Sequence, residues 1–147
     1  MGLWQVGFFV LPRESAGSRF ALDEEGSFDD SPYWLEQKVL PGFFDPIAAF
    51  LPVEKSWSEK ICLYGSHDSN RVEVSHDNGI VESVSFRIDI TSQYETVLAE
   101  LIEFCILNGL VVLDEKLSAL PLNFEVIKFV IENSQQVKGY RALAGKM

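Results

Sequence analysis

The stretch from Arg71 to Ile90, RVEVSHDNGIVESVSFRIDI, is the part of the sequence that best indicates the fold. Apolar residues alternate with polar ones on both sides of Asp-Asn-Gly, as expected for two strands that each bury one face. The residues expected on the buried face are all even-numbered: Val72, Val74, Val84, Phe86, Ile88 and Ile90. The pattern therefore predicts a β-hairpin.

The even numbering also predicts the register of this hairpin. Directly opposed residues lie on the same face of a sheet, so the numbers of two paired residues must add up to an even number. A two-residue Asn78-Gly79 turn would pair Asp77 with Ile80, which gives an odd sum. We therefore predict a three-residue loop, Asp77-Asn78-Gly79, in which Gly79 takes the left-handed conformation of a bulge.

The segments on either side predict further strands and helices. Strands are expected at 4–11, 60–65 and 110–114. Ser92 and Glu95 fit a capping box at the start of a long amphipathic helix, which Asn108-Gly109 would end. Shorter helices are expected at 32–38 with Ser31 as N-cap, at 46–51, and from Asn123 onwards.

These elements predict an α+β fold, in which a mainly antiparallel sheet with a central meander is packed by two or more helices. A chain of 147 residues is most simply one domain. We expect that domain to span residues 1–147, with a basic tail from about residue 137 that carries Lys138, Arg141 and Lys146.

The two histidines, His67 and His76, lie in two copies of the tripeptide Ser-His-Asp. The five residues 71–75 between these copies span roughly 16 Å when extended, whereas a shared metal needs both rings about 2 Å from one ion. We therefore expect two turns at opposite ends of one strand. The sequence predicts no metal site, no cofactor and no catalytic residue.

Cys62 and Cys105 are the only cysteines, and both lie in apolar segments. We expect them to be small buried hydrophobic residues. A Cys62–His67 pair is an alternative nucleophilic site, but an apolar strand lacks the electropositive environment that a thiolate needs.

Charge and hydropathy restrict the classes of partner. The formal net charge is −10, which disfavours nucleic acid because phosphate binding depends on Lys and Arg. The apolar runs fall short of the about 18 residues that suggest a membrane span, and the N-terminus lacks the positive region of a signal peptide. We expect a cytoplasmic protein whose field attracts a basic partner.

A surface of carboxylates and aromatic rings is the best candidate for binding such a partner. Aromatic side chains bury large areas at low entropic cost, and carboxylates speed association with a basic protein. The predicted partner-binding residues come from two segments that contain no Lys or Arg: Glu24, Glu25, Asp29, Asp30, Tyr33, Trp34, Glu100 and Glu103.

Three stretches, FLPVEKSW (50–57), LYGS (63–66) and SVSFRIDI (83–90) followed by the capped helix, carry a family resemblance. Within residues 50–134 the chain resembles small acidic uncharacterised bacterial proteins that look like toxin-immunity proteins. The resemblance implies a stoichiometric, non-enzymatic inhibitor with one protein partner, a basic toxin domain.

Two other functions are compatible with the sequence. A small hydrolase-like enzyme would use a pocket containing His67 or His76. A homo-oligomeric structural subunit, such as a homodimer, would bury Phe8, Phe9 or Trp34 in a symmetric interface.

Overall fold

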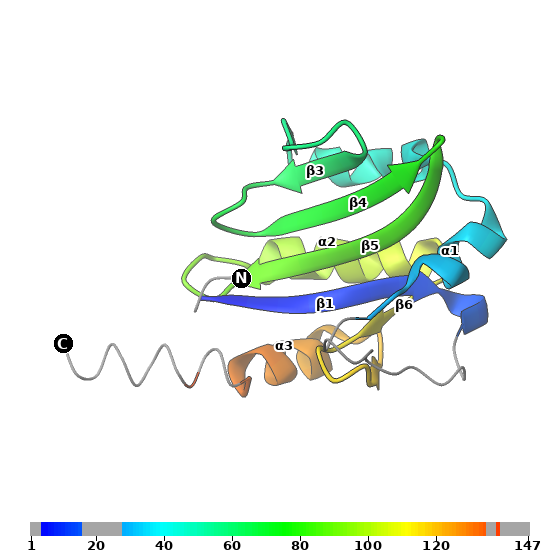
Figure 1. Cartoon of the computed structure of the whole chain (residues 1–147). Coiled ribbons are helices and arrows are strands. Elements are labelled where there is room, and N and C mark those ends of the chain that lie inside the picture. Colours follow the sequence, from blue (N-terminus) through cyan, green and yellow to red (C-terminus); the bar gives the residue numbers. More distant parts are fainter. Residues whose placement is uncertain (1–3, 16–27, 135–137, 139–147) are drawn as a thin grey trace.

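A computed structural model describes residues 4–15, 28–134 and 138 (Figure 1). The strands are β1 (Gln5–Pro12), β2 (Val53–Glu54), β3 (Ile61–Gly65), β4 (Arg71–Asp77), β5 (Ile80–Asp89), β6 (Leu110–Leu113) and β7 (Ala119–Leu120). The α-helices are α1 (Ser31–Gln37), α2 (Glu95–Leu107) and α3 (Phe124–Glu132), and the 3₁₀ helices are η1 (Arg13–Ser15) and η2 (Pro41–Ala49). Apart from Lys138, the predicted basic tail lies outside the described residues.

The seven strands form one antiparallel sheet in the order β2-β3-β4-β5-β1-β6-β7. Strands β3 to β5 form the predicted meander, to which the short strand β2 adds an unpredicted edge, and β1 pairs with both β5 and β6. The predicted α+β class with a mainly antiparallel sheet is therefore confirmed.

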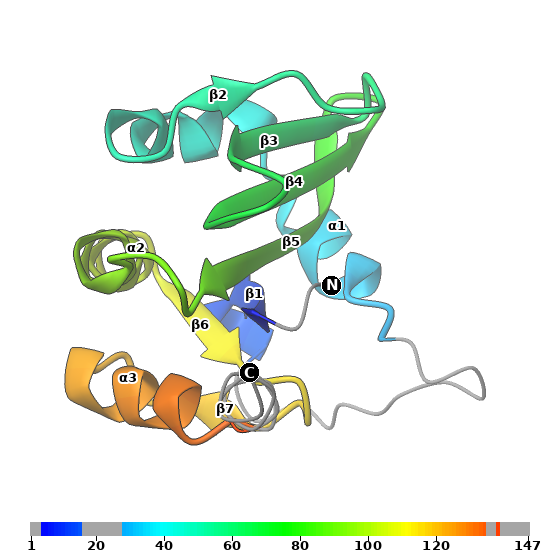
Figure 2. The ribbon, with the colours of Figure 1, turned by 90° about the vertical axis from the view of Figure 1, so that its left-hand side faces the viewer.

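Helices lie on both sides of this sheet (Figure 2). Helices α2, α3 and η2 lie on one side and α1 on the other. The even-numbered face of the meander packs towards α2 and η2, where Phe8 stacks on Phe86 with their ring centroids 4.9 Å apart. The burial of the even-numbered residues confirms the face predicted from the alternating pattern.

The β4–β5 hairpin has the predicted parity but a different turn. Val74 pairs with Val84, whereas Asp77 pairs with Ile80, so the turn is the two-residue Asn78-Gly79. Both turn residues have positive φ, 53° and 74°. The register shifts at a bulge between Ser75 and His76. The predicted three-residue loop is wrong because the extra residue, Glu82, lies in the strand rather than in the loop.

Two of the predicted helix starts are also corrected. The Ser92 hydroxyl donates to the Asp89 carbonyl at 2.8 Å, and α2 begins at Glu95 without a side-chain cap. Ser31 is the first residue of α1 rather than its N-cap, because the Asp29 carboxylate accepts from its backbone N–H and its hydroxyl. At α3, the Asn123 side chain accepts from the Val126 N–H, which confirms that start.

The short helix expected at 46–51 is part of a longer 3₁₀ helix, η2, which contains Pro46 in its interior. A proline has no backbone N–H to donate and disfavours an α-helix at this position. Within the described ranges, no helix is both long and apolar enough to cross a bilayer.

Candidate functional site

Two of the predicted partner-binding residues lie in the interior. The Trp34 side chain is 0% exposed, its Nε1 donates to the Val10 carbonyl at 3.0 Å, and its ring packs against Phe44. Asp30 is buried and accepts from the Ser83 hydroxyl at 2.9 Å. Placing Trp34 and Asp30 on the surface was wrong, because α1 packs against the sheet with Trp34 turned inwards, and Asp30, just before the helix, is buried as well.

The remaining predicted residues do not form one surface. Asp29 is exposed and Tyr33 half-buried beside Phe28, on the α1 side of the sheet. Glu100 and Glu103 are exposed on α2, on the opposite side. Glu24 and Glu25 lie outside the described residues.

The aromatic residues suggested for a symmetric interface are also covered by their own chain. Phe8 and Trp34 are buried, and Phe9 is half-buried against Phe28. These rings contribute to the core of one chain without a second copy.

The two histidines lie at opposite ends of β4, as predicted. His67 is in the β3–β4 turn, whereas His76 lies within β4 itself rather than in a turn. In the ranges that the structure covers, no three His, Cys, Asp or Glu side chains are grouped to hold a metal ion.

Neither thiol has the environment of a nucleophile. Burial raises the pKa of the Cys105 thiol to about 12. Burial, with a smaller effect of the Asp45 charge, also raises the pKa of Cys62. A thiol must ionise to attack an electrophile, so burial disfavours the nucleophilic form of both cysteines.

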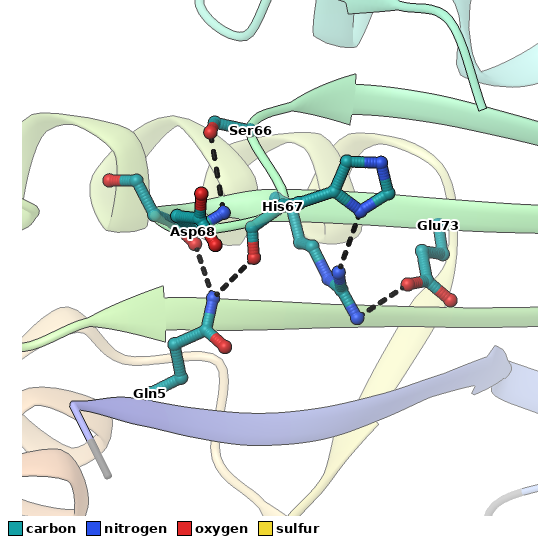
Figure 3. A network of polar contacts seen from close by, with 7 residues as sticks. Gln5, Ser66, His67, Asp68 and Glu73 are labelled. Carbon is teal, nitrogen blue, oxygen red and sulfur yellow. Dashed lines mark hydrogen bonds and ion pairs between the residues drawn. The ribbon is translucent and has the colours of Figure 1, made fainter. Parts of the chain in front are cut away.

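The β3–β4 turn is held against β1 by side-chain hydrogen bonds (Figure 3). The Gln5 amide donates to the carbonyls of His67 and Ser69, at 3.2 and 2.8 Å. The Trp4 indole donates to the Asp68 carbonyl at 2.9 Å. These bonds fix a turn that leans over the end of β5 and places His67 beside β4.

Gly65 is required where this turn leaves β3. Its φ is +90°, and a Cβ there would lie 2.2 Å from the Asn70 carbonyl oxygen. The Ser66 N–H donates to that same carbonyl at 3.1 Å. Only glycine accommodates both this conformation and this close approach.

Arg71 lies under the turn, on the odd-numbered face of the sheet. Its Nη2 is 2.7 Å from a Glu73 carboxylate oxygen, and its Nη1 is 3.3 Å from His67 Nδ1. The His67 ring in turn packs near Trp57, with the centroids 5.1 Å apart. With these neighbours around it, the Arg71 residue is only 8% exposed.

Arg71 is directly opposite Arg87 on the neighbouring strand. The same row continues to Gly65 beyond Arg71 and to Gly7 beyond Arg87. The pairing of two arginines was not predicted, although the hairpin parity contained the signal: 71 and 87 add up to the same number as Val74 and Val84.

A second feature is an acidic and apolar surface on the other side of the sheet, which we name the α2–α3 surface. Helices α2 and α3 are neighbours there and run antiparallel (Figures 1 and 2). Leu107 is 72% exposed and Phe129 66%. The surface consists of the exposed residues Glu100, Glu103, Ile106 and Leu107 of α2 and Glu125, Val126, Phe129 and Glu132 of α3.

No protein-family model, no curated protein and no solved structure matches this chain.

The histidines are expected to contribute little to stability. His67→Ala and His76→Ala should each change the free energy of unfolding by less than about 1 kcal/mol, as is usual outside the core, since His67 is exposed and His76 half-buried. Urea unfolding of each variant measures the change. If the wild-type protein bound a metal ion and either variant lost it, the separate placement of the two rings would be contradicted.

Proposed function

We propose that this chain is a non-enzymatic protein-binding protein that uses the α2–α3 surface to bind one basic protein partner. The observation that carries this proposal is the exposure of Ile106, Leu107 and Phe129 beside carboxylates on two neighbouring helices. Aromatic residues such as Phe are enriched in the cores of interfaces, where a few anchors supply most of the binding energy, and the surrounding charges supply register and orientation.

The charge of the molecule indicates the chemistry of the partner. The net charge is −10, and the acids that contribute to it include four exposed carboxylates of the α2–α3 surface, Glu100, Glu103, Glu125 and Glu132. The cation on α3 is Lys128, whose Nζ lies 4.0 Å from a Glu132 carboxylate oxygen and 5.8 Å from the centroid of the Phe124 ring. Such a field accelerates association with a positively charged protein, and salt weakens it.

The specific form of the proposal is an immunity-type inhibitor that neutralises a basic bacterial toxin. The acidic balance and the resemblance of residues 50–134 to immunity proteins support it. Inhibition would be stoichiometric, because the protein acts by covering its partner rather than by turning over a substrate.

Phe129→Ala is expected to weaken partner binding about tenfold, the effect typical of an exposed aromatic anchor. The partner is first obtained by pull-down from the organism that produces the chain, at low and at moderate salt. Its affinity for the purified wild-type protein and the variant is then measured by calorimetry, which also gives the stoichiometry.

Trp57→Ala is the matched control for Phe129→Ala. Trp57 is also a largely exposed aromatic residue, but it lies between β2 and β3, away from α2 and α3. Equal loss of affinity in both variants, or loss only in Trp57→Ala, would place the binding surface elsewhere.

A further inference from the structure

Arg71 and Arg87 lie opposite each other on the face of the sheet that is turned away from α2. Helix α1 packs against β5 and β1, with Asp30 just before it hydrogen-bonded to Ser83. In Figure 1 α1 lies near the start of β5, and no other described α-helix lies on this face. Arg71 is the first residue of β4, and Arg87, opposite it, is near the other end of β5. Directly opposed side chains in neighbouring strands have their Cβ atoms about 5 Å apart. Two guanidinium groups therefore rise from adjacent positions.

The glycines at the two ends of the row leave space beside these side chains. Gly65 is the neighbour of Arg71 and Gly7 the neighbour of Arg87. Neither has a side chain to cover a guanidinium. Ser85, on the next row of the same face and opposite Glu73, contributes a half-buried hydroxyl.

The two guanidinium groups have unused hydrogen-bonding capacity. Arg71 is more than nine-tenths buried, and its Nε has no acceptor among the described residues. Arg87 is half-buried, and it forms no ion pair within 4 Å and no side-chain hydrogen bond with any residue that the structure describes. Buried donors without acceptors are rare in proteins, and a bound ion or water is one of the arrangements that satisfies them.

The electrostatic environment of Arg87 favours an added negative charge. Burial lowers the pKa of Arg87, and the positive charge of Arg71 lowers it further, whereas the charges of Glu73 and Glu115 act in the opposite direction. Glu73 Oε1 lies 2.7 Å from Arg71 Nη2 as an ion pair, but it is buried and has no hydrogen-bond donor among the described residues, and one Glu115 oxygen accepts from the Gly7 N–H at 3.2 Å. An anion over Arg87 would reduce the repulsion between the two arginines.

We infer that Arg71 and Arg87 form a binding site for a small oxyanion, the phosphate or carboxylate group of a small molecule. Arg87 makes the main contact, because a guanidinium binds phosphate and carboxylate through two parallel hydrogen bonds. Arg71 supplies the second positive charge and is held in place by Glu73 and His67. The site is distinct from the α2–α3 surface.

The test is a ¹H–¹⁵N NMR titration of the full-length protein with inorganic phosphate, and separately with succinate, at constant ionic strength. We expect saturable shifts of the amides around Arg71 and Arg87 with at least one of the two anions. The anion that binds more tightly indicates whether the natural group is a phosphate or a carboxylate. Shifts that do not saturate, or that occur equally over the whole surface, would overturn the inference.

Variants separate a specific site from general charge attraction. Arg87→Gln should weaken binding at least tenfold and Arg87→Lys less, because lysine keeps the charge but loses the paired hydrogen bonds. Arg13→Gln removes the same charge from an exposed position in η1 and should leave binding unchanged. Equal weakening by Arg87→Gln and Arg13→Gln would overturn the inference. If Arg87→Gln does not fold, the comparison of Arg87→Lys with Arg13→Gln decides in the same way.

Discussion

Replacing Trp34 with alanine is expected to lower the free energy of unfolding by about 3–5 kcal/mol, the range for removal of a large aromatic side chain from a core. The Trp34 ring is completely buried against Phe44, and its indole N–H donates to the Val10 carbonyl. The substitution therefore leaves a cavity and a buried carbonyl without its donor. Equilibrium unfolding in urea, followed by circular dichroism, measures the loss.

Leu35→Ala is the control for this substitution. Leu35 is the next residue in α1 but is 45% exposed, so its truncation should cost less than about 1 kcal/mol. A Trp34→Ala variant that unfolds like the wild type but loses partner binding would contradict the burial of Trp34. It would restore Trp34 as the surface anchor that the sequence alone suggested.

Asp30→Asn is expected to stabilise the protein by about 2–3 kcal/mol at pH 8 and to have little effect at pH 4. Burial raises the pKa of the Asp30 carboxyl from 3.8 to about 6, against the opposing effect of the Ser83 hydrogen bond. The folded protein therefore binds this proton more tightly than the unfolded chain does. The contribution of Asp30 to stability is complete below about pH 4 and is lost as the pH rises through about 6.

The amide introduced by Asp30→Asn would remain neutral at every pH, and its oxygen could still accept from the Ser83 hydroxyl. The measurement is urea unfolding of the wild type and Asp30→Asn at pH 4 and at pH 8. A variant that is destabilised equally at both pH values would show that the Asp30 charge is not the source of the effect.

Asp29→Asn provides an adjacent control of opposite sign. Hydrogen bonds from the Ser31 hydroxyl and N–H lower the pKa of the exposed Asp29 carboxyl. The stability that Asp29 contributes is therefore present at neutral pH and is lost as the pH falls below its ordinary pKa. Asp29→Asn should weaken the protein slightly at pH 8 and not at low pH.

The meander was predictable because period-two patterns are local properties of the sequence. The even-numbered stripe from Val72 to Ile88 fixed which face is buried and which residues pair across β4 and β5. It could not show whether the one-residue offset lies in the loop or at Glu82. Both solutions place the same side chains in the core, so the hydrophobic pattern does not distinguish them.

The site was harder to predict because exposure depends on packing between distant segments. Tyr33 and Trp34 are adjacent in a seven-residue helix, too short for its apolar period to show which one faces the sheet. Phe129 did carry a local signal. It lies off the buried stripe of Ile127 and Ile131, and a large apolar residue outside such a stripe indicates an exposed anchor.

The most direct test of the proposed function is a comparison of two double charge reversals with the same net charge. Glu100→Lys/Glu103→Lys changes the α2–α3 surface, whereas Glu36→Lys/Glu59→Lys changes two exposed acids in α1 and in the β2–β3 connection. The affinity of each for the captured basic partner is measured at low and at moderate salt. We predict at least a tenfold loss for the first pair and a small, salt-screened loss for the second. Equal losses for the two pairs, or an unchanged affinity in Glu100→Lys/Glu103→Lys, would contradict binding through the α2–α3 surface.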